Sequence, residues 1–255
     1  MAKDPVKMRK LLALTAVGTV VLLGGQAVAA DMPEYPPIDV PDVDYDVGGS
    51  FYLRGSAALN FHYAPDVTHP SDGTVYDIEQ YGYGYSWGAG FGYETGTGLR
   101  FDATMDSVET AGLTITKVAP DPYPGDYTLM LRSTVALANI YYDFGLGDGF
   151  GGYSGGGGAF GYVGAGAGVA WNHAETNSPL IADVPVPTGG NVSAAAAIMA
   201  GVGYDMGKWV ADVGYRGLYI NQINNAPTDE TTTSYFETDH NWIHEVRGTV
   251  RYRFD

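Results

Sequence analysis

Two pairs of polar residues are the part of this chain that could do acid–base chemistry. Asp239 and His240 are adjacent, and such a pair can activate water when a second acid assists. Ser234 and His244 could supply a nucleophile and its base. Neither pair lies in a recognisable motif, and an ordinary polar loop explains both of them. We therefore predict no catalytic residue and keep a hydrolase as an alternative.

Two further motifs fail on their spacing. The acidic segment Asp42–Asp46 is similar to the start of a calcium loop, but Val47 and Leu53 stand where such a loop needs glycine and glutamate. The glycines of Gly164–Gly168 do not have the spacing of a dinucleotide fingerprint, and no helix signal follows them. The sequence therefore predicts no metal site and no cofactor.

Charged residues that alternate with large apolar residues form a third candidate site. Side chains two positions apart on a strand share a face, so the alternation gathers these charges on one face. If the strands close into a narrow barrel with this face inside, such charges are tolerable only when they are paired and hydrogen-bonded. We therefore expect an interior salt-bridge network that closes the lumen, formed by Arg54, Arg100, Asp102, Asp212, Arg216, Glu245, Arg247 and Arg251.

The element that must position these charges is a long β-strand. From Tyr81 to Tyr93, aromatic or small apolar residues occupy every odd position, and glycine or serine occupies every even one. A helix would scatter those aromatics round its circumference, so the pattern indicates a strand. The same period recurs seven times between Phe51 and Phe254. In the segment 128–142 its phase is ambiguous, and we expect a bulge there to reconcile the two halves.

Eight strands of roughly 12–15 residues predict an all-β fold, an eight-stranded antiparallel transmembrane β-barrel. A water-soluble barrel would put the aromatic face inside a lumen too narrow for it, so we place that face in lipid. The aromatics expected in lipid or in the interfacial girdles are Phe51, Tyr81, Tyr83, Trp87, Phe91, Tyr93, Trp171, Tyr204, Trp209, Trp242 and Phe254.

The predicted connections alternate between long ones and short ones such as 94–97, as outer loops and periplasmic turns do. The exception is 143–158, which is either a long turn or a hidden hairpin that would make ten strands. The long connections hold thirteen acidic residues and one base, Lys117. They could attract divalent cations that bridge lipopolysaccharide phosphates, although acidity also serves simple solubility.

The N-terminus has the pattern of a secretory signal peptide. Four basic residues precede the uncharged run Leu11–Gly25, which is shorter than a membrane span, and Ala27–Ala29 supplies small residues at the cleavage site. We predict a cleaved signal peptide over 1–30, an acidic, proline-rich arm over 31–48 and the barrel over 49–255. Cleavage would change the net charge from −16 to −19, which argues against nucleic-acid binding.

Several short motifs resemble one family. Phe51–Gly55, Asn139–Asp143, Tyr162–Gly166, Ala200–Tyr204 and Arg251–Phe254 are similar, in this order, to small alphaproteobacterial outer-membrane barrels of the OmpA-like porin family. The resemblance implies a cell outer membrane location with periplasmic termini, lipid and lipopolysaccharide as partners, and assembly by the barrel-assembly machinery. Asp255 departs from it, because family members end in an aromatic residue.

The sequence thus predicts an envelope protein with a structural, surface-exposed role and no catalysis. A narrow cation-leaning porin is the main alternative, since acidic loops would favour cations. An adhesin that binds through its loop tips is another.

Overall fold

The computed structural model describes residues 48–64, 66–68, 75–117, 125–147, 157–177, 188–225 and 237–254. These residues form β-strands and short turns, and they include no helix that is long and apolar enough to cross a membrane. The predicted signal peptide, the acidic arm and Asp255 lie outside the described residues.

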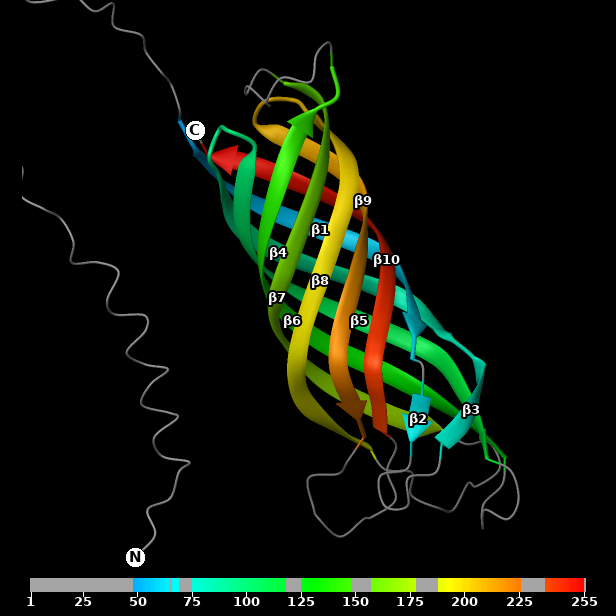
Figure 1. Ribbon diagram of the computed structural model, residues 1–255. Helices are drawn as coiled ribbons and strands as arrows, with labels where there is room; N and C mark the ends of the chain where they lie inside the picture. Colours follow the sequence, from blue (N-terminus) through cyan, green and yellow to red (C-terminus); the bar gives the residue numbers. More distant parts are fainter. Residues whose placement is uncertain are drawn as a thin grey trace, which may run out of the picture. The chain divides into compact units, whose positions relative to one another are not determined.

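Eight antiparallel strands close into a ring (Figure 1). β1 pairs with β4 along one edge and with β10 along the other, so the first and last strands complete the barrel. The predicted eight-stranded antiparallel barrel is therefore confirmed. Its strands are β1 (Ser50–Tyr63), β4 (Gly82–Glu94), β5 (Leu99–Lys117), β6 (Gly125–Gly145), β7 (Gly158–Asn177), β8 (Thr188–Asp205), β9 (Trp209–Asn224) and β10 (Glu237–Phe254).

Two short strands extend the first hairpin. β2 (Asp66–Thr68) pairs with β10, and β3 (Val75–Gln80) pairs with β5, at the end of the barrel where β1 and β4 have stopped. They lie at the lower end of the barrel in Figure 1. We call this the far end, and we call the opposite end, where β1 begins and β10 finishes, the terminal end.

Most strands are longer than the sequence predicts, and this corrects two turn assignments. Glu94 and Asp143 were expected in connections, but they are the last residue of β4 and a paired residue of β6. Strand pairing continues to the tight turn Thr95–Gly98, whose carbonyl at Gly98 accepts a hydrogen bond from the Asp143 amide at 2.7 Å. Gly98 has a φ of +90°, a conformation that glycine adopts without strain.

The prediction of a bulge in segment 128–142 is wrong. β6 keeps one phase throughout, with Leu129, Leu131, Val135 and Leu137 buried inside the barrel. The irregularity lies instead in its neighbour β5, where the register with β6 shifts between Thr110 and Leu113. The segment was ambiguous because β6 carries apolar side chains on both faces.

The outer surface carries an apolar belt. On β7 it runs over the nine residues from Val163 to Trp171, and on β1 it includes Leu59, which is 75 % exposed. At a rise of about 3.3 Å per residue and a tilt of about 40°, nine residues span about 23 Å, close to the apolar band of barrels that cross a bilayer. An exposed apolar surface of this size is stable in lipid and not in water.

Beyond this belt, at the far end, the two faces exchange their character. Leu113 and Ile115 of β5 are buried inside the barrel beside Tyr127 of β6, while Thr116 and Asp126 lie on the outer side and hydrogen-bond to each other at 2.8 Å. An apolar interior with a polar exterior is the pattern of a barrel in water. The far end therefore projects past the belt.

Candidate functional site

The structure places the eight predicted interior charges on the inner face of the ring. All eight side chains point into the lumen and are buried. They lie in the terminal half of the barrel and form three connected groups with acids from neighbouring strands.

The first group, which we call the central quartet, consists of Asp106, Arg216, Glu245 and Arg247. Arg216 forks onto Glu245 with contacts of 2.6 and 3.0 Å and reaches Asp106 at 2.7 Å. Arg247 bridges the same two acids at 2.8 and 3.1 Å. Ser86 donates a further hydrogen bond to Glu245 at 2.6 Å. Two cations and two anions therefore neutralise one another across β5, β9 and β10.

The second group is built on tyrosines. Arg54 contacts Asp102 at 2.8 Å and donates to the Tyr141 hydroxyl at 2.9 Å. Arg100 lies over the ring of Tyr141, 3.9 Å from its centre, and forks onto Asp143 at 3.0 and 3.1 Å. A guanidinium that stacks and forks in this way is held in one orientation.

Glycines on the neighbouring strands make room for these rings. A Cβ atom at Gly92 would lie 2.5 Å from the hydroxyl end of Tyr52, and one at Gly164 would collide with the ring of Tyr141. The bare inner faces of β4 and β7 are thus the surfaces on which interior tyrosines rest.

The third group closes the terminal end. Arg251 pairs with Glu94 and lies 3.8 Å from both Asp143 and Asp212. Arg253 contacts Glu94 at 2.7 Å and Asp205 at 2.7 Å. In the three groups, six arginines face seven carboxylates, so the charges nearly balance.

Five of these charged residues were absent from the network that the sequence predicts. Asp106 has the inward phase of β5 but was not included, and Glu94 and Asp143 were assigned to turns. Arg253 likewise has the inward phase of β10 but was not included, and Asp205 is the last residue of β8, beside a turn. A count of charges could have indicated the missing acids. Five of the eight predicted charges were arginines, and the three predicted acids were too few to neutralise them.

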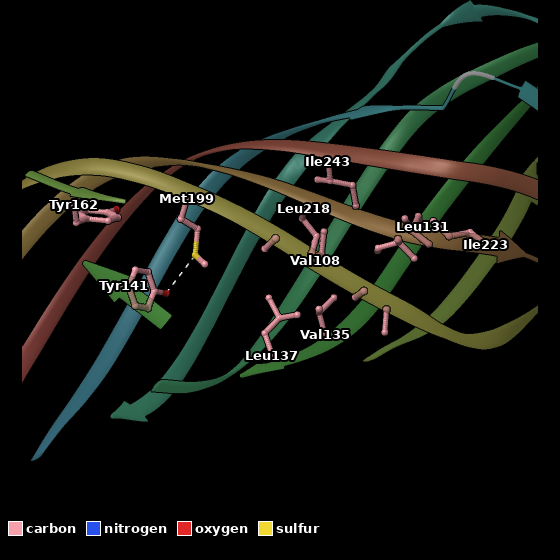
Figure 2. Packing of buried hydrophobic residues seen from close by; sticks show 14 of the residues in the cluster. Val108, Leu131, Val135, Leu137, Tyr141, Tyr162, Met199, Leu218, Ile223 and Ile243 are labelled. Atoms are coloured by element: carbon pink, nitrogen blue, oxygen red, sulfur yellow. Dashed lines mark hydrogen bonds between the residues drawn. The ribbon is translucent and has the colours of Figure 1, made fainter. Parts of the chain in front are cut away.

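The far half of the interior holds an apolar cluster, which was not predicted from the sequence, beside uncharged hydrogen-bonded side chains such as Ser133 with Asn172 and His62 with Asn241. Val108, Leu131, Val135, Leu218 and Ile243 meet there from four strands, β5, β6, β9 and β10 (Figure 2). On β10 the change is abrupt, since Glu245 and Ile243 are consecutive inward residues. The lumen is therefore filled by ion pairs in one half and by hydrocarbon with uncharged polar side chains in the other.

Little space remains between the charged groups. A cavity of about 10 Å³ lies beside Arg54, Arg100, Tyr162 and Arg247, which is about the room that one water molecule needs. The charges hold one another in place and leave no free cation or anion to bind a solute at this point.

The predicted girdle aromatics lie on the outer face. Nine of the eleven are exposed, namely Phe51, Tyr81, Tyr83, Trp87, Phe91, Trp171, Tyr204, Trp209 and Phe254. Tyr93 is half-buried against Phe51, at 4.9 Å between ring centres, and Trp242 is half-buried against Tyr219 at 5.3 Å.

The possible hydrolase pair does not converge. Asp239 accepts a hydrogen bond from Gln222 at 3.4 Å, whereas His240 bonds to the Tyr219 hydroxyl at 2.7 Å and stacks on its ring. His240 has a φ of +54°, and the inward alternation of β10 slips there, because Thr238 and Asn241 are both buried. His244 is likewise bonded to Tyr215, while Ser234 lies outside the described residues.

No group of three or more metal-ligating side chains occurs among the described residues. Most of the acidic connections lie outside them, so divalent-cation binding by the loops stays a prediction. The proposed extra hairpin within 143–158 also falls largely outside the described part of the chain.

The sequence matches no protein-family model, and a comparison with curated proteins finds no relative. Solved structures with a similar chain path include Neisserial surface protein A, at 20 % identity over 81 % of this chain and 99 % of that one, with a TM-score of 0.48. The outer membrane protein OprG from Pseudomonas aeruginosa matches at 13 % identity over 81 % and 97 %, with a TM-score of 0.48. The outer membrane protein AlkL matches at 12 % identity over 91 % and 97 %, with a TM-score of 0.38. The barrel assignment rests on the strand pairing itself.

Proposed function

We propose that this chain is a closed outer-membrane barrel with a structural role in the envelope, whose far end faces the outside and whose termini face the periplasm. The observation that carries the proposal is the filled lumen. The central quartet, the tyrosine-built group and the terminal group occupy one half, and an apolar cluster with uncharged polar side chains occupies the other. A pore would need a continuous water path, and these buried side chains lie in its way.

The orientation follows from the two ends. The terminal end has the tight connections Thr95–Gly98 and Met206–Lys208, and short turns in such barrels face the periplasm. At the far end the strands continue past the apolar belt with a polar exterior, which suits the aqueous side of a surface. Lipopolysaccharide as a neighbour and insertion by the barrel-assembly machinery are part of this proposal, as are the predicted export signal and the OmpA-like kinship.

Single cysteines test the orientation directly, because the chain has none of its own. Thr188 lies at the far end of the barrel and Lys208 lies in a turn at the terminal end, and both residues are exposed. Two variants, Thr188→Cys and Lys208→Cys, each carry one cysteine. A membrane-impermeant maleimide added to intact cells should label Thr188→Cys alone, and both variants should react after lysis. Labelling of Lys208→Cys on intact cells, or labelling of Thr188→Cys only after lysis, would overturn the assigned orientation.

The structural role has its own test. Cells that lack the chain should become more sensitive to detergent, and a plasmid copy should restore resistance without increasing the uptake of small solutes. If loss of the chain instead slows the uptake of a hydrophilic solute, the porin alternative replaces the scaffold.

A further inference from the structure

The outer wall of the barrel carries a hollow at the far edge of the apolar belt. It has a volume of about 430 Å³ and is lined by apolar groups of Leu59, Tyr83 and Met130 from β1, β4 and β6. A second hollow of about 670 Å³ lies deeper in the belt on the same strands, between Leu53, Phe91 and Met105.

Between the two hollows lies a row of residues that we call the notch. Trp87, Ser107, Thr134 and Trp171 form one row across β4, β5, β6 and β7, each directly opposite the next. The two tryptophans stand as exposed walls, and the serine and threonine between them are short. A linear hydrocarbon chain running from the belt edge toward the bilayer centre would fit between these walls.

The edge of the first hollow is charged. Arg132 and Glu109 are opposite each other on the outer face, with Nε and Oε1 3.6 Å apart, and the Arg132 side chain is 68 % exposed. The Tyr85 hydroxyl donates to the other oxygen of Glu109 at 2.8 Å. His173 is the next residue along the row and lies 3.4 Å from Glu175.

The apolar hollows and the charged edge together suit an amphiphilic ligand. An exposed guanidinium at a bilayer surface can fork onto a phosphate. The carboxylates of Glu109 and Glu175 would repel a bare phosphate cluster, but they accept hydrogen bonds from sugar hydroxyls. The apolar hollows and the notch below them take an acyl chain.

We infer that this wall site binds a phosphorylated glycolipid of the outer leaflet, with the phosphate on Arg132, sugar hydroxyls on Glu109 and Glu175, and one acyl chain in the notch. The inference rests on the proposed orientation, which puts the far end in the leaflet that holds such lipids. It assigns lipid recognition to the barrel wall, apart from the acidic loops.

The test measures lipid A binding to the refolded barrel in detergent micelles by native mass spectrometry, with folding checked by heat-modifiable gel migration. The wild type should retain one lipid A. Arg132→Gln should weaken retention about tenfold, as expected for a lost charge-assisted hydrogen bond. Lys208→Gln removes the same charge in a terminal turn and should bind like the wild type.

A second pair of variants tests the notch. Ala136→Phe should reduce binding by filling the deeper hollow, which Ala136 lines, whereas Ala200→Phe places the same ring on the outer face of β8 and should not. Equal retention by Arg132→Gln and Lys208→Gln would overturn the site, as would equal effects of the two phenylalanines. Equal binding of phosphatidylglycerol would overturn the glycolipid, and equal binding of dephosphorylated lipid A would overturn the phosphate contact. Micelle binding does not depend on orientation in cells, so this result stands apart from the cysteine labelling.

Discussion

Glu245 shows how much a single interior residue carries. Its carboxylate accepts hydrogen bonds from Arg216, Arg247 and Ser86 and is almost wholly buried. Removing one partner of a buried ion pair costs more than the pair itself contributes, because the remaining charges lose their compensation. Here two arginines would share Asp106 alone.

We therefore expect Glu245→Ala to lower the free energy of unfolding by about 3–5 kcal/mol. The measurement is urea unfolding of the barrel in lipid vesicles, followed by tryptophan fluorescence. Glu175→Ala, which removes a half-exposed carboxylate on the outer face, is the matched control and should change stability by about 0.5 kcal/mol or less. Equal unfolding midpoints for the two variants would show that the central quartet does not stabilise the barrel.

Residue types and their spacing predict only part of the interior network. A period of two is enough to group Arg54, Arg100 and Asp102 on one face, because their neighbours are large and apolar. It gives no signal at Glu94 or Asp143, where a glycine lies within two residues, and pairing across the barrel decides whether the strand continues. Which arginine takes which acid depends on the closure of β1 onto β10, and no local pattern records that closure.

At the scale of the strand, the informative feature is the switch of faces at the edge of the belt. The sequence Leu218-Tyr219-Ile220 is apolar on both faces, so alternation cannot tell which side is the core. In the structure Leu218 and Ile220 are buried inside the barrel, and Tyr219 belongs to the outer girdle. The far-end core could not be read from the sequence for this reason.

The part of β5 beyond the belt should behave as a water-soluble sheet. Ile115 is fully buried there, among Leu113, Tyr127 and Leu129. Ile115→Asn would place an amide in that apolar cluster and should open it locally, since the belt below has its own packing.

Hydrogen exchange in vesicles measures this prediction. Amides of residues 113–117 and 127–131 should lose protection in Ile115→Asn, while those of Phe101–Met105 stay protected. Thr116→Asn changes the outer face of the same strand and should leave both regions as in the wild type. Loss of protection along all of β5 would mean that the far end and the belt unfold as one unit.

The described barrel has two kinds of filling and two kinds of surface. The belt is apolar outside and encloses the ion pairs together with Val135 and Leu137, whereas past the belt the outer face is polar and an apolar cluster lies inside. The barrel class and the approximate strand positions follow from the sequence, because eight long alternating segments have few other ways to satisfy their backbone in lipid. The lumen is closed by hydrocarbon as well as by charge. This closure could not be predicted from the sequence, because it depends on which residues of all eight strands meet inside the barrel.

Single-channel recording of the refolded barrel in a planar bilayer tests this closure most directly. The filled interior predicts a silent membrane while folded protein is present, in either direction of applied voltage. Reproducible conductance steps from the folded barrel would contradict the closed lumen and with it the structural role.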